Sequence, residues 1–131
     1  MMAKREQIST PDAPAAVGAY SQAIRVGDLV FTAGQLGIDP ATGEMAGAGV
    51  TEQAERAIAN LEAILSAAGS GLANLVKVTV FLADIADWPA LNEVYSRLIP
   101  EPFPARSAFA VKDLPRGARV EIEAVAAVGA G

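Results

Sequence analysis

The chain has 131 residues, 52% of them hydrophobic, and a net charge of −5 because 10 Lys and Arg stand against 15 Asp and Glu. It contains neither cysteine nor histidine, which excludes disulfides, thiolate nucleophiles, imidazole bases and ordinary zinc sites. The few basic residues are dispersed along the chain, which argues against a nucleic-acid partner.

The length predicts a single domain over residues 1–131. The hydrophobic fraction is high for a small monomer and indicates a buried interface between subunits. The longest uncharged run, between Glu62 and Lys77, is too short to span a membrane and is interrupted by glycines. Residues 1–6 lead into no apolar segment typical of a signal peptide, so we expect a cytoplasmic protein with no membrane partner.

The first third of the chain predicts a loose arm followed by a hairpin. Residues 1–12 are polar and are expected to form the arm. Strands are expected at residues 21–26 and 29–33, joined by the Gly27–Asp28 turn. Gly34 follows the second strand, and it either simply ends the strand or lets a ligand approach the backbone closely.

Two helices and a strand are predicted next. Thr51 is a good N-cap for a helix that Gly69 would end. Residues 75–83 predict a third strand, because Val76, Val78 and Val80 alternate with Lys77, Thr79 and Phe81. Asp87 is expected to cap a second helix that Pro100 ends. The side chains expected to point inward from this second helix are Leu91, Val94, Tyr95 and Leu98.

The last part of the chain predicts two further strands, at residues 103–111 and 119–125. If they pair as a hairpin-like unit, Arg106 and Glu121 are neighbours on one wall. A guanidinium that grips a carboxylate, beside a carboxylate that orders a water, is a minimal hydrolytic site. The alternative is that both residues are ordinary solvated strand charges.

The element order β, β, α, β, α, β, β predicts an α+β layered fold with two helices on one face of the sheet. No glycine fingerprint opens a helix after a strand, which excludes a dinucleotide-binding fold. No run of spaced acidic residues resembles a calcium or magnesium loop. We therefore expect neither a metal ion nor an organic cofactor.

Several ordered blocks of the sequence resemble the RidA/YjgF family. The resemblance covers nearly the whole chain, and several blocks at family-like spacing are more specific than any one motif. The blocks are APAAVGAY (13–20), TAGQ (32–35), VKVTVF (76–81), Asn92 with Tyr95, PARS (104–107), LP (114–115) and VEIEA (120–124).

The resemblance implies a chorismate-mutase-like α+β sandwich and a homotrimer with clefts between its subunits. It also implies hydrolysis of 2-imino acids such as 2-iminopropanoate and 2-iminobutanoate to 2-oxo acids and ammonia. An imine carbon is already electrophilic, so such an enzyme needs orientation, a placed water and proton transfer rather than a covalent nucleophile.

The resemblance further assigns roles to particular residues. Arg106 would grip the substrate carboxylate, and Glu121 would position the water and move protons. Tyr20 and Gly34 would line the cleft from a neighbouring chain. Asn92, which on helical pattern alone is solvated surface, matches a further polar position of the same site.

One position departs from the family, because Ala108 stands where many members carry cysteine. The backbone of Ala108 can still hydrogen-bond a ligand, so hydrolysis remains possible while the substrate preference is open. Glu123 shares a strand face with Glu121 and either raises the pKa of Glu121 by like-charge repulsion or faces another subunit.

Two other functions remain open at this point. One is a noncatalytic ligand-binding or chaperone-like protein on the same fold. The other is a deaminase for aminoacrylate or aminomuconate rather than for short aliphatic imines. A ribonuclease or translation inhibitor, an activity attached to some relatives, is not supported because no basic surface and no histidine are present.

Overall fold

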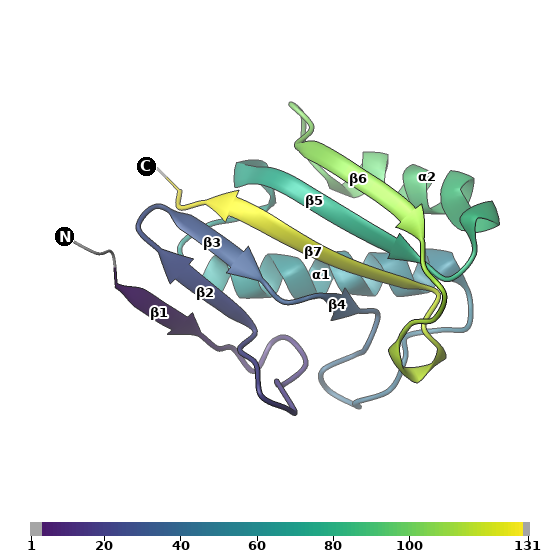
Figure 1. Ribbon diagram of the computed structural model, residues 1–131, viewed down its shortest axis with the longest axis horizontal. Helices are drawn as coiled ribbons and strands as arrows, with labels where there is room; N and C mark the ends of the chain where they lie inside the picture. The colour runs from purple at the N-terminus through teal and green to yellow at the C-terminus, as the bar shows by residue number, and fades with distance from the viewer. Residues whose placement is uncertain (1–3, 130–131) are drawn as a thin grey trace.

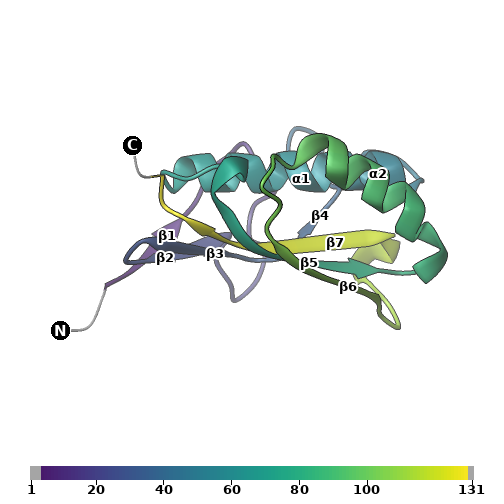
Figure 2. The same cartoon turned by 90° about the horizontal axis from the view of Figure 1, so that it is seen from above.

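The computed structural model describes residues 4–129, and these form one mixed sheet with two α-helices on one of its faces (Figures 1 and 2). This confirms the predicted α+β arrangement. The strands are β1 (Arg5–Ile8), β2 (Ala23–Val26), β3 (Leu29–Thr32), β4 (Gln35–Leu36), β5 (Leu75–Leu82), β6 (Ala105–Ala110) and β7 (Val120–Ala127). The helices are α1 (Val50–Ala67) and α2 (Trp88–Leu98), with short 3-10 turns at Leu72–Asn74, Ile85–Asp87 and Pro115–Gly117.

The N-terminal segment is more ordered than the sequence predicted. The β1 strand pairs antiparallel with β2, so Arg5–Ile8 of the expected loose arm form an edge strand, while residues 1–3 lie outside the described residues. The β2 and β3 strands form the predicted hairpin, and Gly27 takes a φ of 57° in the turn between them. A positive φ is easily adopted by glycine, which explains the residue type at this turn.

The helix α1 begins two residues earlier than Thr51 indicated. Gly49 is the N-cap, and its N–H donates to Oε2 of Glu52 at 3.2 Å. Glutamate at the third helical position therefore satisfies an N–H that the helix itself leaves unpaired. The predicted end is confirmed, because Gly69 follows the C-cap with a φ of 82°.

The helix α2 begins where predicted, although Asp87 does not cap it with its side chain. The Asp87 carboxylate instead accepts hydrogen bonds from the guanidinium of Arg119, with Nη2 to Oδ2 at 2.7 Å. This ion pair ties the start of α2 to the residue before β7. Of the residues expected to face inward, Leu91, Val94 and Tyr95 are buried.

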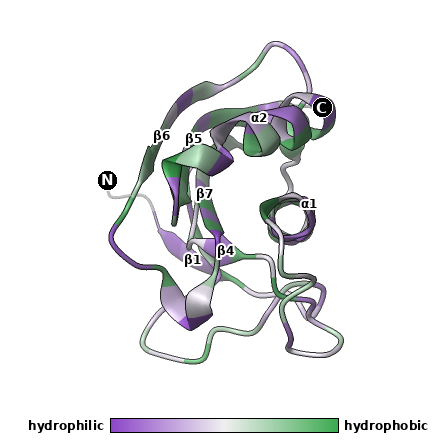
Figure 3. Ribbon diagram, turned by 90° about the vertical axis from the view of Figure 1, so that its right-hand side faces the viewer, coloured by the Kyte–Doolittle hydropathy of each residue, from purple (hydrophilic) through white to green (hydrophobic). Residues whose placement is uncertain are grey.

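The core lies between the helices and one face of the sheet, as the end-on view shows (Figure 3). Alternate residues of the central strands, such as Val78, Val80 and Ile122, are at most 1% exposed. They pack with Leu61 of α1 and Leu91 of α2. Period-two alternation thus sends every second side chain of β5 and β7 to the core and the others to the open face.

The pairing of the last two strands differs from the prediction. The sheet order is β1-β2-β3-β7-β5-β6, with β4 also paired to β7, so β5 lies between β6 and β7 (Figure 1). The β6 strand pairs parallel with β5 and does not form a hairpin with β7. The reason is the crossover through α2, which returns the chain to the same end of the sheet and makes β5 and β6 parallel neighbours.

Buried amides hold the loops near β4. Asn60 of α1 is fully buried and donates to the carbonyls of Leu36 at 3.1 Å and Ile38 at 2.9 Å. Gln22 donates in the same way to the carbonyl of Pro14 at 2.8 Å. Because a buried amide without partners is costly, these bonds fix the loop backbone in one place.

Neither described helix is both long and apolar enough to cross a bilayer.

Candidate functional site

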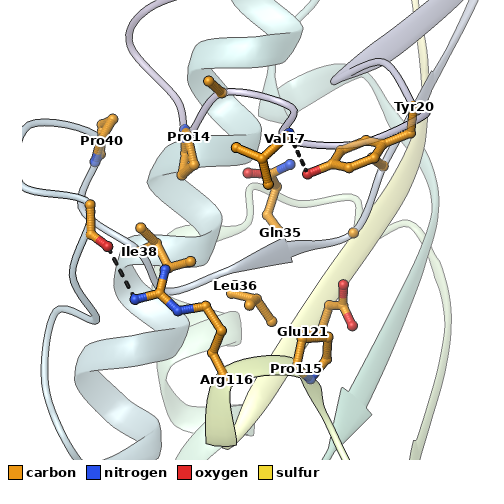
Figure 4. Close-up of a pocket in the computed structure, with 14 residues that line it drawn as sticks. Pro14, Val17, Tyr20, Gln35, Leu36, Ile38, Pro40, Pro115, Arg116 and Glu121 are labelled. Atoms are coloured by element: carbon orange, nitrogen blue, oxygen red, sulfur yellow. Dashed lines mark hydrogen bonds between the residues drawn. The ribbon is translucent and has the colours of Figure 1, made fainter.

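A pocket of about 800 Å³ opens beside β4 and the first half of β7 (Figure 4). Its walls come from the loop before β2, from β4 and the loop after it, and from the turn before β7. Tyr20, Gly34 and Glu121, three residues singled out from the sequence, line it together. The structure therefore brings these three together within one chain.

The Glu121 side chain occupies the space that Gly34 leaves free. A Cβ atom added to Gly34 would lie 2.8 Å from Cδ of Glu121 and closer still to its carboxylate oxygen. The absence of a side chain at Gly34 therefore leaves room for the carboxylate of Glu121, in addition to any ligand that approaches the backbone there. This close approach explains why the residue is glycine, since a side chain would displace Glu121.

The environment of Glu121 favours the protonated acid. Burial raises the pKa of Glu121 above its usual value, and the negative charge of Glu123 raises it further. The two glutamates lie on the same face of β7, opposite Phe81 and Thr79 of β5. A carboxyl group with a raised pKa is better suited than an ordinary glutamate to accept a proton and return it.

Two further residues shape the pocket. Tyr20 is 52% exposed, and its hydroxyl accepts a hydrogen bond of 3.4 Å from the N–H of Val17 (Figure 4). Arg116, which the sequence reasoning missed, donates from Nη2 to the carbonyl of Gly43 at 3.2 Å (Figure 4). Its φ of 59° is uncommon for a residue other than glycine. The only sequence signal for Arg116 was its place in the turn after Pro115.

A second group of predicted residues lies elsewhere, between β6 and α2. Arg106 donates from Nη1 to Oδ1 of Asn92 at 2.9 Å. Its guanidinium carbon also lies 4.9 Å from the ring centroid of Trp88 and 4.6 Å from that of Tyr95. Asn92 is therefore not the solvated surface residue that the helical pattern indicated, because it binds the arginine of the neighbouring strand.

One chain does not place Arg106 beside Glu121, so that prediction is wrong for the single chain. Arg106 is in register with Val78, whose side chain is buried under the helices. Glu121 is in register with Phe81, on the opposite, open face of β5. The two functional groups thus project from opposite faces of the sheet, with β5 between their strands.

Ala108 lies in β6 on the same face as Arg106 and packs against the core. The N–H of Val111 donates to the carbonyl of Leu82. In a parallel pair, only every second residue of a strand directs its backbone N–H and C=O groups to the same neighbouring strand. The backbone groups of Arg106 and Ala108 are therefore directed to the unpaired edge of β6. A ligand or a second chain can reach them there without any cysteine side chain.

The open face of the sheet carries aromatic side chains. Phe31 and Phe109 are each 45% exposed, and Phe109 packs edge-on against Phe81 with ring centroids 5.4 Å apart. The same face carries Glu121 and Glu123.

Within residues 4–129, no cluster of three or more acidic side chains is placed to bind a metal ion.

The chain matches a protein-family model described as Endoribonuclease L-PSP over residues 10–128. It is 51% identical over 125 residues to a goat (Capra hircus) protein named 2-iminobutanoate/2-iminopropanoate deaminase, covering 95% of this chain and 91% of that protein. It is 58% identical over 120 residues to the RutC family protein y4sK of Sinorhizobium fredii, covering 92% of this chain and 95% of that protein.

Solved structures agree with the fold. RidA from the Antarctic bacterium Psychrobacter superposes with a TM-score of 0.91 at 47% identity, covering 94% of this chain and 99% of that one. The structure of TdcF from E. coli with bound serine gives a TM-score of 0.90 at 38% identity, covering 95% and 99%. At these identities the likeness extends beyond the fold to the sequence family.

Replacing Gly34 by alanine tests the contact between Gly34 and Glu121. Gly34→Ala should displace the Glu121 carboxylate and reduce any activity of this site by about 10-fold or more, since small misplacements are costly in catalysis. Gly71→Ala is the matched control, because a Cβ there meets nothing within 4 Å. Steady-state kinetics and circular dichroism on both variants measure the effect. Unchanged activity in Gly34→Ala would show that the position of Glu121 does not matter.

Proposed function

This chain belongs to the RidA/YjgF family, and we propose that it is a hydrolytic deaminase of 2-imino acids. Its substrates are reactive imines or enamines such as 2-iminobutanoate and 2-iminopropanoate, and its products are 2-oxo acids and ammonia. The observation that carries the proposal is the pocket that Glu121, with its raised pKa, lines together with Tyr20, and in which it lies against Gly34. The names of relatives about 50% identical support the same reaction.

The reaction needs one water and one proton shuttle. The Glu121 carboxylate accepts a proton from water as the water oxygen bonds to the imine carbon, which gives a tetrahedral carbinolamine. The protonated Glu121 returns this proton to the nitrogen. It then takes the hydroxyl proton of the carbinolamine and delivers it to the amino nitrogen as the C–N bond breaks, so that ammonia leaves and the carbonyl forms. A carboxyl group with a raised pKa takes up a proton more readily than an ordinary glutamate and can perform these transfers.

Arg106 supplies the substrate clamp in this proposal. A guanidinium offers two parallel N–H donors that match a carboxylate. The hydrogen bond to Asn92 uses one N–H of Nη1 and leaves other donors for a ligand. The edge-directed backbone of Ala108 provides further hydrogen-bonding groups beside the clamp. None of these steps needs a metal ion or an organic cofactor.

The complete site requires more than one copy of the chain. Arg106 with Asn92 and Glu121 with Tyr20 lie on opposite faces of one sheet, so a second chain must bring the missing half. We assign the assembly to the homotrimer of the chorismate-mutase-like arrangement, with a cleft between each pair of subunits. The exposed aromatic side chains Phe31 and Phe109 support an interface over the open face.

A noncatalytic ligand-binding or chaperone-like role is the alternative. Such a role would need the pocket and the clamp but no group that moves protons. The raised pKa of Glu121 favours catalysis. Within the catalytic reading, aminoacrylate and aminomuconate remain possible substrates beside the short aliphatic imines.

Replacing Glu121 by glutamine separates catalysis from binding. Glu121→Gln keeps the shape of the side chain but cannot exchange protons, so turnover of imines generated by an amino-acid oxidase should fall by roughly 100-fold or more. The affinity for 2-oxobutanoate, measured by calorimetry, should change far less because Arg106 holds the carboxylate. Arg106→Ala should show the reverse pattern, with affinity lost first. Wild-type turnover in Glu121→Gln would identify Glu121 as a structural strand charge.

The pH dependence tests the influence of Glu123. Because burial and then Glu123 raise the pKa of Glu121, kcat/KM should rise with pH through a pKa above the usual glutamate value. Glu123→Gln removes the charge of Glu123, the smaller cause of the raised pKa. The rise of kcat/KM with pH, which is the acid limb of the profile, should then move to lower pH. Glu62→Gln, an exposed change on α1, is the control and should leave the limb in place. An unmoved limb in Glu123→Gln would mean that the two carboxylates are not coupled.

The same pKa shift has a consequence for stability. A raised folded-state pKa means that ionisation of Glu121 costs stability as pH rises through that pKa. Glu121→Gln should therefore stabilise the protein more at pH 7 than at pH 4, a difference that thermal unfolding at the two pH values measures.

A further inference from the structure

The Arg106 guanidinium is enclosed by side chains of a single helix. Its central carbon lies 4.9 Å from the Trp88 ring centroid and 4.6 Å from the Tyr95 ring centroid, and Nη1 donates to Asn92 at 2.9 Å. Both ring distances are within the range of a cation–π interaction, which extends to about 6 Å. Three contacts from α2 therefore converge on one side chain of β6.

The spacing of these residues explains how one helix supplies all the contacts. Asn92 follows Trp88 by four positions, and Tyr95 follows Asn92 by three. Residues three and four apart lie one above the other on the same helix face. That face is directed at β6, the parallel partner of β5 to which α2 is connected. The crossover that makes β5 and β6 parallel thus also lays this stripe of α2 over Arg106.

We propose that Trp88 and Tyr95 are positioning residues for the Arg106 clamp. Aromatic side chains attract a guanidinium through the negative face of the ring. Asn92 fixes one edge of the Arg106 guanidinium through its hydrogen bond to Nη1. Within residues 4–129, the hydrogen bonds of the Arg106 side chain involve only Nη1. The remaining N–H groups are left to meet a carboxylate. Their direction is set by the cage that Trp88, Asn92 and Tyr95 form around the guanidinium.

The buried hydroxyl of Tyr95 separates the contribution of the ring from that of the O–H. Tyr95 is 4% exposed, and its hydroxyl has no hydrogen-bond partner among the described residues. A buried hydroxyl without a partner does not help the fold. The ring face, which contacts Arg106, is therefore the part of Tyr95 that acts on the clamp, and phenylalanine should replace it without loss.

Ring-deleting and ring-retaining variants test the cage. Trp88→Leu and Tyr95→Leu should raise the Kd for 2-oxobutanoate and the KM for imine by about 3- to 30-fold, the scale of a partly desolvated cation–π contact. In both variants kcat should stay within about 2-fold, because the proton-transfer group is elsewhere. Trp88→Phe and Tyr95→Phe should bind nearly as the wild type does.

A second readout does not depend on the reaction. In a ¹H–¹⁵N spectrum, the Nε–H signal of Arg106, assigned by its absence in Arg106→Lys, should be displaced by the ring currents of the cage. It should move toward the ordinary arginine position in the two leucine variants and stay displaced in the two phenylalanine variants. If the wild type turns over no imine while this signal responds as described, the proposed function fails and the cage stands.

Leu98→Ala is the control for a merely structural effect. Leu98 lies on α2 and packs against the same core, and its side chain carries neither an aromatic ring nor a hydrogen-bonding group. This variant should lower Tm and leave both the Arg106 signal and the Kd unchanged. The inference is overturned if the leucine variants bind 2-oxobutanoate as the wild type does with an unmoved Arg106 signal. It is equally overturned if Leu98→Ala weakens binding as much, or if Tyr95→Phe weakens it as much as Tyr95→Leu.

Discussion

The position of β5 between β6 and β7 is the constraint on which the functional geometry depends. Because side chains alternate along each strand, Arg106 joins the helix-covered face and Glu121 the open face. The helix α2 then encloses the arginine, and the pocket beside β4 receives the glutamate. In the proposed mechanism these two residues are halves of one site that a single chain keeps apart, which makes association of chains a requirement of that chemistry.

Local patterns predicted most of the elements, while the pairing of β6 required information that proximity in sequence does not carry. The hairpin at Gly27 and the helix end at Gly69 follow from turn chemistry, and both are confirmed. The expected β6–β7 hairpin was wrong because the strand–helix–strand order of β5, α2 and β6 favours parallel neighbours. That order was visible in the sequence, and applying the crossover rule to it would have corrected the pairing.

The site residues also divide into those that local patterns predicted and those that depend on contacts distant in sequence. Glycine at position 34 was recognised as a place of close approach, yet the group that approaches is the carboxylate of Glu121, 87 positions later in the chain. Asn92 was placed on solvent because a helical wheel does not show which strand covers its polar side. Arg116 had no signal beyond its place in the turn after Pro115, and Trp88 had none beyond its residue type. Contacts distant in sequence decide each of these cases, and the resemblance to a family supplied only part of that information.

Mixed oligomers test the central claim most directly, namely that Arg106 of one chain and Glu121 of another form each site. Arg106→Ala and Glu121→Gln, each expected to have little activity alone at low imine concentration, are unfolded together in equal amounts and refolded. In the proposed homotrimer, random mixing leaves one intact cleft in every mixed trimer, so about one quarter of wild-type activity should return. Each variant refolded by itself should show no such recovery. No recovery in the mixture, with mixed trimers verified by mass, would contradict a site shared between chains.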